Sequence, residues 1–118
     1  DGMINNCPTR VIVEHYAGYI PPNYSQKDIE GWKKVLENLT QISPGWNALK
    51  NTGEFYDKNR GDVDRINDII SQRISNIQAI IARMEKNQWL TPQEQSYIPQ
   101  DQTLFAQQEE LAKKLNAQ

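Results

Sequence analysis

The sequence predicts a mainly α fold, a small three-helix bundle with an extended N-terminal arm that can hold a single short strand. Apolar side chains recur every three or four positions between residues 63 and 84, a spacing that places them on one stripe of a helix. Helix-start signals stand at Ser25 and Thr91. The apolar content is 37%, below the roughly 45–50% of ordinary globular domains, which suits a thin bundle with much exposed surface.

The length of the chain, 118 residues, predicts one domain, with an arm at 1–24 and a helical bundle at 25–116. Its 13 basic and 15 acidic residues nearly balance, and no basic block is present. The long-range field that draws proteins to phosphate backbones is therefore missing, so nucleic-acid binding is only a second alternative. No apolar stretch approaches the roughly 20 residues that a membrane span needs.

The arm is expected to be extended because of the β-branched run 11–13, which lies between Pro8 and Gly18. A lone strand has no ladder partner, so this segment either pairs elsewhere or runs as an extended arm. Two interpretations of the arm stay open. It binds a partner, or it is clamped on its own bundle.

The first helix is expected at 25–42. Ser25 can cap it, and Asp28 stands three residues on, which is a variant of the capping box. Pro44 is expected to end the helix, because the residue before a proline avoids the helical region. The apolar face of this helix consists of Ile29, Trp32, Val35, Leu36, Leu39 and Ile42.

A connection is expected at 45–61, and the long helix at 62–87. Charged residues at both ends of this helix complement its macrodipole: Asp62 and Asp64 at the start, Arg83 and Lys86 at the end. Ile74 and Ile77 lie in the middle of the apolar ladder and are expected to be buried. The ladder consists of Val63, Ile66, Ile70, Ile74, Ile77, Ile81 and Met84, widened by Ile69 and Ile80.

The segment after the long helix contains a strong helix start, with Thr91 as cap, proline at the first helical position and glutamate at the third. This helix is expected to be short because Pro99 interrupts it. Asp101 is then expected to cap a last helix at 101–116. The ladder should face apolar residues of the first helix on one side and of the last helix on the other, namely Trp32, Leu36, Leu39, Leu104, Leu111 and Leu115.

Residues with catalytic potential are few. His15 is the only histidine, it follows Glu14, and the single cysteine, Cys7, lies eight residues before it. These do not make the three or four ligands of a zinc site, and we expect no metal or cofactor. A small enzyme or ligand-binding domain that uses His15 with Glu14 or Cys7 is the first alternative, because nucleophile and base need only be near in space.

The function that the sequence favours is a non-enzymatic protein–protein interaction module. This expectation rests on the polar helices and the aromatic arm. Tyrosine is common in recognition surfaces because it combines a rigid contact area with hydrogen bonding. Aromatic residues in the helices and connections can instead pack in the core and where helices join, or they can form a platform on which sugars or bases stack. The candidate partner-binding residues are Tyr16, Tyr19, Tyr24, Trp46 and Tyr56.

Two stretches resemble the minor pilin, or pilus-tip component, of bacterial type IV secretion systems. One comprises residues 29–32, the polar–apolar helix that follows, and residues 51–53. The other comprises residues 73–78 and the glutamine-rich stretch 105–108 with Leu111. The resemblance covers about half of the chain and rests on composition and helix spacing. It implies an exported helical bundle with a role in adhesion or assembly.

The expected partner is another protein, and the expected setting is a bacterial secretion or surface component, periplasmic or extracellular. The ladder can be covered by the first and last helices of the same chain, or it can be shared across a symmetric dimer. A monomer is favoured, because both other helices carry apolar faces of matching length.

Overall fold

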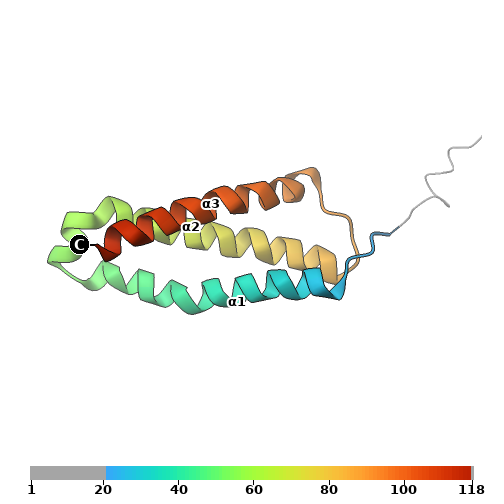
Figure 1. Ribbon diagram of the computed structural model, residues 1–118, viewed down its shortest axis with the longest axis horizontal. Helices are drawn as coiled ribbons and strands as arrows, with labels where there is room; N and C mark the ends of the chain where they lie inside the picture. Colours follow the sequence, from blue (N-terminus) through green and yellow to red (C-terminus); the bar gives the residue numbers. More distant parts are fainter. Residues whose placement is uncertain (1–20, 118) are drawn as a thin grey trace, which may run out of the picture.

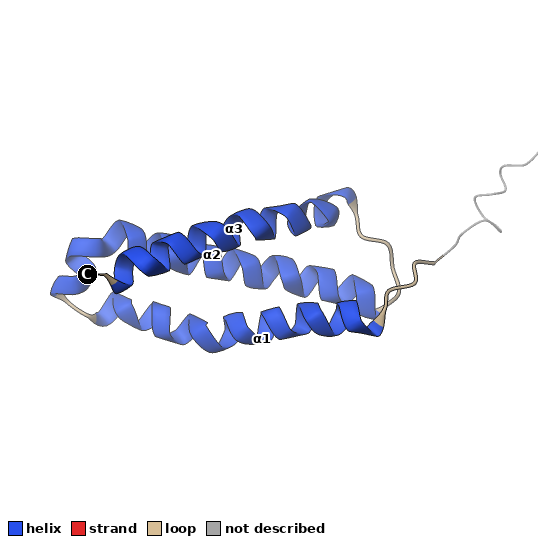
Figure 2. Cartoon of the chain, viewed as in Figure 1, coloured by secondary structure: helices blue, strands red, loops and turns tan. Residues whose placement is uncertain are grey.

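A computed structural model describes residues 21–117. Three helices pack side by side: α1 (Gln26–Ala48), α2 (Glu54–Glu85) and α3 (Pro92–Asn116), with a short 3-10 turn, η3 (Leu49–Asn51), after α1. Figures 1 and 2 show α1 and α3 flanking α2, with no strand in the described part of the chain. The mainly α prediction is confirmed, whereas the predicted strand at 11–13 lies outside the described residues.

The first helix begins as predicted. The Ser25 side chain accepts a hydrogen bond from the Asp28 backbone N–H at 3.1 Å, which satisfies one of the free donors of the first turn. The predicted end at residue 42 is wrong, because α1 continues through Pro44. A proline inside a helix costs about 3 kcal/mol. Contacts of the residues that follow Pro44 offset this cost. Trp46 lies against the core, and its carbonyl accepts a hydrogen bond from buried Asn67 at 3.1 Å.

The long helix is longer than predicted. It begins at Glu54 instead of residue 62, so most of the expected connection is helical. Asn59 has non-helical angles (φ −120°, ψ 22°), and its side chain donates to the Phe55 carbonyl at 2.9 Å. Residues 59–61, whose Asn-Arg-Gly sequence is typical of turns, therefore lie at a kink inside α2, while Phe55 on the added turn packs against the core.

The end of α2 reverses the chain within a few residues. Asn87 adopts a left-handed conformation (φ 57°), which asparagine tolerates better than most residues. The backbone N–H of Gln88 then donates to the Arg83 carbonyl at 2.9 Å, and that of Asn87 donates to the Met84 carbonyl at 3.1 Å. These bonds satisfy carbonyls at the end of α2 and direct the chain toward α3.

The last helix starts at Pro92 with the capping box that the sequence predicts. The Glu94 backbone N–H donates to the Thr91 hydroxyl, and the Glu94 carboxylate accepts from the Thr91 backbone N–H. The expected interruption at Pro99 is wrong, since α3 runs unbroken to Asn116. Asp101 is consequently no cap. It lies inside the helix and is buried.

The core runs along α2 and is divided into two clusters. The larger contains most of the ladder and residues of both flanking helices, among them Leu39 and Leu115. The smaller joins Ile80 and Met84 to Ile29 of α1. The ladder is thus covered from both sides within one chain, as predicted.

Burial along the ladder is uneven. Ile77 is fully buried, as expected, but Ile74 is only half-buried. We expect Ile77→Ala to lower the free energy of unfolding by about 2–5 kcal/mol, and Ile74→Ala by clearly less, because less surface returns to water. Urea denaturation followed by circular dichroism measures both. Equal costs at the two positions would contradict the arrangement of this core.

Candidate functional site

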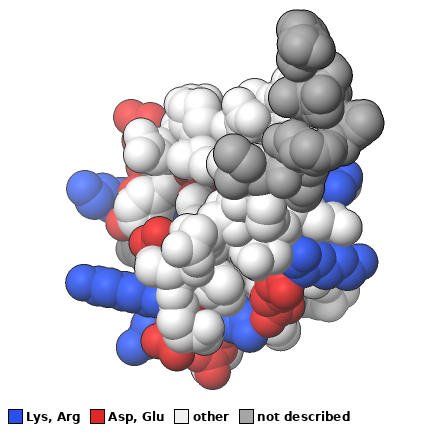
Figure 3. Space-filling model, turned by 90° about the vertical axis from the view of Figure 1, so that its right-hand side faces the viewer, with Lys and Arg blue, Asp and Glu red and all other residues white. Residues whose placement is uncertain are grey.

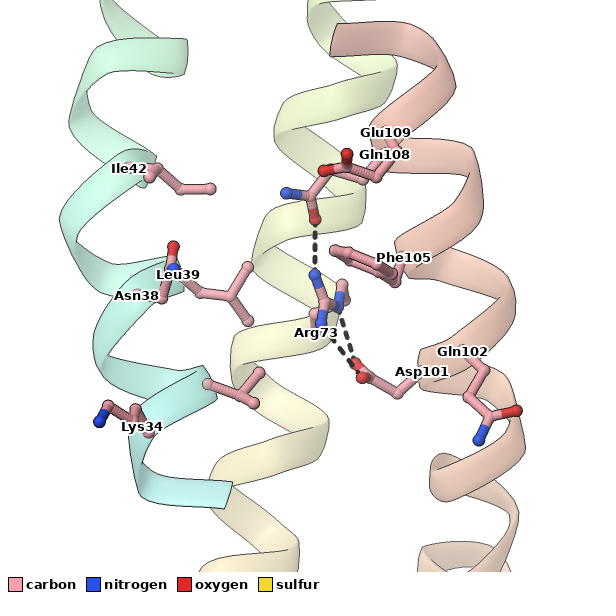
Figure 4. Close-up of a pocket in the computed structure, with 11 residues that line it drawn as sticks. Lys34, Asn38, Leu39, Ile42, Arg73, Asp101, Gln102, Phe105, Gln108 and Glu109 are labelled. Carbon is pink, nitrogen blue, oxygen red and sulfur yellow. Dashed lines mark hydrogen bonds and ion pairs between the residues drawn. The ribbon is translucent and has the colours of Figure 1, made fainter. Parts of the chain in front are cut away.

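A groove of about 660 Å³ lies between α1 and α3, with α2 as its floor. Figure 4 shows the groove with side chains from all three helices pointing toward it. It exists because α1 and α3 each pack chiefly against α2. The lining residues are Lys34, Val35, Asn38, Leu39, Ile42, Arg73, Asp101, Gln102, Phe105, Gln108 and Glu109.

The floor of the groove holds a buried polar network centred on Arg73. The Arg73 guanidinium donates to both carboxylate oxygens of Asp101, from Nε at 2.8 Å and from one terminal nitrogen at 3.1 Å. Its other terminal nitrogen donates to Gln108 Oε1 at 2.8 Å. Arg73, Asp101 and Gln108 are only 4%, 8% and 5% exposed. A charged pair buried this deeply requires such complete pairing, because an unpaired charge would be very costly.

A sequence interpretation that follows apolar residues alone places Arg73 on the polar face of the long helix, whereas the structure buries it. A signal for its burial exists in the spacing. Arg73 stands three residues after Ile70 and four before Ile77, so it continues the apolar stripe. Asp101 and Gln108 share the apolar stripe of α3 with Leu104 in the same way, at steps of three and four. Matching polar residues within two facing stripes indicate a buried pair.

Further polar pairs join α2 to α3 on both sides of the Arg73 network. Most lie at the edge of the interface: Arg65 donates to Gln107 at 2.9 Å, Arg83 contacts Glu94 at 3.0 Å, and Lys114 contacts Asp62 at 3.0 Å. Buried Asn76 donates to Gln100 at 3.4 Å. The contacts between α1 and α2 are instead mainly apolar.

Phe105 forms part of the wall of the groove and is 47% exposed. Its ring lies over the Arg73 guanidinium, with 5.0 Å between the guanidinium carbon and the ring centroid. A cation facing an aromatic ring is attracted by the negative face of the ring. Arg73 therefore fixes one face of Phe105, and the ring keeps a large apolar surface toward solvent at the groove.

The two rims of the groove carry opposite charges at opposite ends. Lys34 on α1 lies at one end and Glu109 on α3 at the other, with Leu39 and Phe105 between them (Figure 4). Asn38 and Gln102 add exposed amides to the two rims. The Lys34 amine points away from the groove, whereas Leu39 and Phe105 point into it, so the arrangement can bind an apolar segment.

Of the residues predicted as a partner surface, the structure describes Tyr24, Trp46 and Tyr56, and it places Tyr24 in a different core cluster from the other two. Tyr16 and Tyr19 lie outside the described residues. Tyr24 is half-buried against the smaller core cluster, and its hydroxyl donates to the Gln88 carbonyl at 2.8 Å, so this end of the arm is clamped on the bundle. Trp46 and Tyr56 pack against the larger cluster, and a helix of about 22 residues, roughly 33 Å, separates Trp46 from Tyr24.

Two ionisable groups depart from their ordinary pKa. The hydrogen bond from the Tyr56 hydroxyl to Asp64, 2.7 Å long, raises the pKa of Tyr56. The backbone hydrogen bond from Thr91 lowers the pKa of Glu94, and the nearby Arg83 adds to this. The Glu94 contribution to stability is therefore present above its unfolded pKa and is lost as the pH falls through the lowered folded value. Both shifts arise from structural contacts, and neither group lies at the groove.

Evidence for catalytic or nucleic-acid-binding chemistry is sparse in residues 21–117. His15, Glu14 and Cys7 lie outside this range. Within it, no three His, Cys, Asp or Glu side chains gather as a metal site. Figure 3 shows basic and acidic side chains interspersed on one end face of the molecule, without a continuous basic patch over the described residues in view.

Neither the helices nor the comparisons with known proteins assign this chain to a class of protein. None of the described helices is long and apolar enough to cross a membrane. No family model, curated protein or solved structure matches the chain.

The Arg73–Asp101 pair provides a test of how α3 is held. We expect Asp101→Asn to destabilise the fold by about 3–5 kcal/mol, because it leaves a buried guanidinium uncompensated. The double variant Arg73→Met with Asp101→Leu should recover most of that loss, since an apolar pair of similar volume needs no partner. Urea denaturation measures both.

Lys58→Ala serves as the control, because the Lys58–Glu54 pair is exposed and its loss should change stability by less than about 1 kcal/mol. If Asp101→Asn is as mild as the control, the buried network does not hold α3 in place.

Proposed function

We propose that this domain is a non-enzymatic protein-binding module and that the groove between α1 and α3 receives an apolar segment of the partner. The observation that carries the proposal is the exposed ring of Phe105. A large aromatic side chain held rigidly at a groove is typical of binding hot spots, which are enriched in anchored residues within desolvated pockets.

The floor of the groove supports a binding role over a catalytic one. Arg73 donates three hydrogen bonds, two to Asp101 and one to Gln108, and its guanidinium faces the Phe105 ring. A catalytic cation would instead need donors left for a substrate oxygen. The network is better suited to holding the wall at a fixed position, which lowers the cost of ordering on binding.

Site-specific photo-cross-linking tests the proposal. A photoreactive residue at Gln102, on the exposed rim, should give a discrete cross-linked product in cells that express the chain from its own gene. The same residue at Gln78, exposed on α2, is the matched control and should give none. Phe105→Ala should reduce the Gln102 product by about tenfold, as expected for loss of a hot spot above 1 kcal/mol.

Equal products at Gln102 and Gln78 would contradict a binding groove. Phe105→Leu keeps an apolar side chain at the rim and separates loss of contact from loss of structure. Circular dichroism of both Phe105 variants checks that the helices persist.

We also propose that the partner belongs to a bacterial secretion or surface assembly. The support is the resemblance of residues 29–32 and 105–108 to the minor pilin of type IV secretion systems. Exposed amide side chains on α3, such as Gln102 and Gln107, fit a solvated module of this kind. Cell fractionation with an antibody to the chain should find it in the periplasmic or extracellular fraction. Detection in the cytoplasmic fraction alone would rule out this setting.

A further inference from the structure

The three helices leave one corner of a four-helix bundle open. α1 and α3 each pack chiefly on α2 and run in the same direction, and α2 lies behind them in Figure 1. In a four-helix bundle, helices at opposite corners are likewise held apart by the two helices between them. The groove lies at the corner opposite α2, and none of the helices within residues 21–117 fills it.

Each helix beside the groove carries a second stripe of residues next to the one that packs on α2. Residues that line the groove belong to these stripes, whose steps of four and three are typical of contacts between helices. Both stripes cover 14 residue steps, from 31 to 45 and from 98 to 112, which is about 21 Å along a helix. The stripes consist of Gly31, Val35, Asn38, Ile42 and Gly45 on α1, and of Ile98, Gln102, Phe105, Glu109 and Ala112 on α3.

The α1 stripe is open to close approach at both of its ends. A Cβ atom added at Gly31 or at Gly45 would meet no atom within 4 Å. The backbone of an occupant can therefore come near α1 at these two positions. Val35 and Ile42, which line the groove between them, offer apolar contact.

The walls of the groove determine the backbone form of the occupant. Both walls are α-helices, whose backbone N–H and C=O groups pair within the helix and cannot pair with an extended chain. The side chains at the centre of the walls, Val35, Ile42 and Phe105, are apolar. An extended segment would leave backbone polar groups unpaired against this surface, which is costly, whereas a helix pairs them internally.

One unpaired charge at the groove indicates the charge of the occupant. Glu109 lines the groove, its side chain is directed from α3 toward α1 in Figure 4, and no hydrogen bond or ion pair engages it within residues 21–117. Arg73 and Asp101 on the floor are already paired with each other. Because Glu109 stands four residues after Phe105, a Lys or Arg that pairs with it lies one helical turn from the residue that contacts the Phe105 ring.

A second copy of this chain does not supply such a basic residue. Within the described helices, Phe105 is the one large apolar residue that is exposed. The residues three and four positions from it are acids and amides, namely Asp101, Gln102, Gln108 and Glu109. Two copies that met through their grooves would therefore leave Glu109 without a cation.

We propose that the groove between α1 and α3 binds an amphipathic α-helix of another protein and that this helix completes a four-helix bundle. The helix spans about four turns and presents apolar residues at steps of three and four. It carries a Lys or Arg one turn from the apolar residue that contacts Phe105. The inference rests on the proposed function, since it names the kind of segment that the groove receives.

Two designed peptides test the form and the charge of the occupant. The probe is a peptide of about 18 residues, built of Ala and Gln, with Leu at heptad positions a and d and one Arg a turn after the central Leu. Its matched control has Glu in place of this Arg. In NMR titrations below the concentration at which the peptides self-associate, the Arg peptide should shift amide signals of residues 31–45 and 98–112. It should bind about fivefold more tightly than the Glu peptide.

Variants of the chain assign these effects to single groups. Glu109→Lys should reverse the preference between the two peptides, whereas Glu110→Lys, at an exposed position outside the groove, should leave the preference unchanged. Phe105→Ala should weaken the binding of both peptides by about tenfold. A proline on the solvent side of the Arg peptide should abolish binding, because it breaks a helix. Circular dichroism checks that each variant of the chain keeps its helices.

Each contrary result rejects a defined part of the inference. Equal binding of the two peptides, or no reversal with Glu109→Lys, would overturn the charge assignment. Binding that survives the proline would overturn the helical form, and amide shifts that grow with chain concentration in the absence of peptide would assign the groove to a second copy. A cross-link at Gln102 in cells without binding of either peptide would keep the proposed function and reject the helix, whereas loss of both would reject both.

Discussion

The buried pairing of Arg73 with Asp101 and Gln108 is the constraint on which the rest of this structure depends. A charge sealed between two helices has a low energy in one register only, because a shift of one turn would leave it unpaired in an apolar environment. Apolar side chains alone are less selective, since isoleucine packs on leucine in several registers. The network therefore aligns α3 with α2 and thereby sets the position of Phe105 and the shape of the groove.

The two interfaces of α2 differ in chemistry, and the difference explains how a thin bundle with few apolar residues is stable. Against α1, α2 buries isoleucines such as Ile66 and Ile70, and this contact supplies hydrophobic stabilisation of the fold. Against α3, polar pairs recur from Asp62–Lys114 at one end to Arg83–Glu94 at the other. Polar pairs add little net stability at an exposed edge, but they specify which surfaces meet.

The sequence could predict three main helices and two of the helix caps, because apolar spacing and caps act locally. Ser25 and Thr91 are both N-caps, as expected, although Thr91 caps the whole of α3 and not a separate short helix. The errors at Pro44 and Pro99 share one physical cause, since tertiary contacts on the far side of each proline outweigh a local helix penalty. The groove could not be predicted from local sequence patterns. Its residues come from three helices, and in a sequence a buried arginine resembles a surface arginine until its partner on another helix is known.

The near independence of α1 and α3 has a mechanical consequence. Each is supported by α2, so their separation can change without breaking a helix pair, while sliding of α3 along α2 would break the Arg73 network. The groove is therefore compliant across its width and stiff along its length. A surface with these properties can accept side chains of different bulk at its centre while it keeps the spacing between its two charged ends.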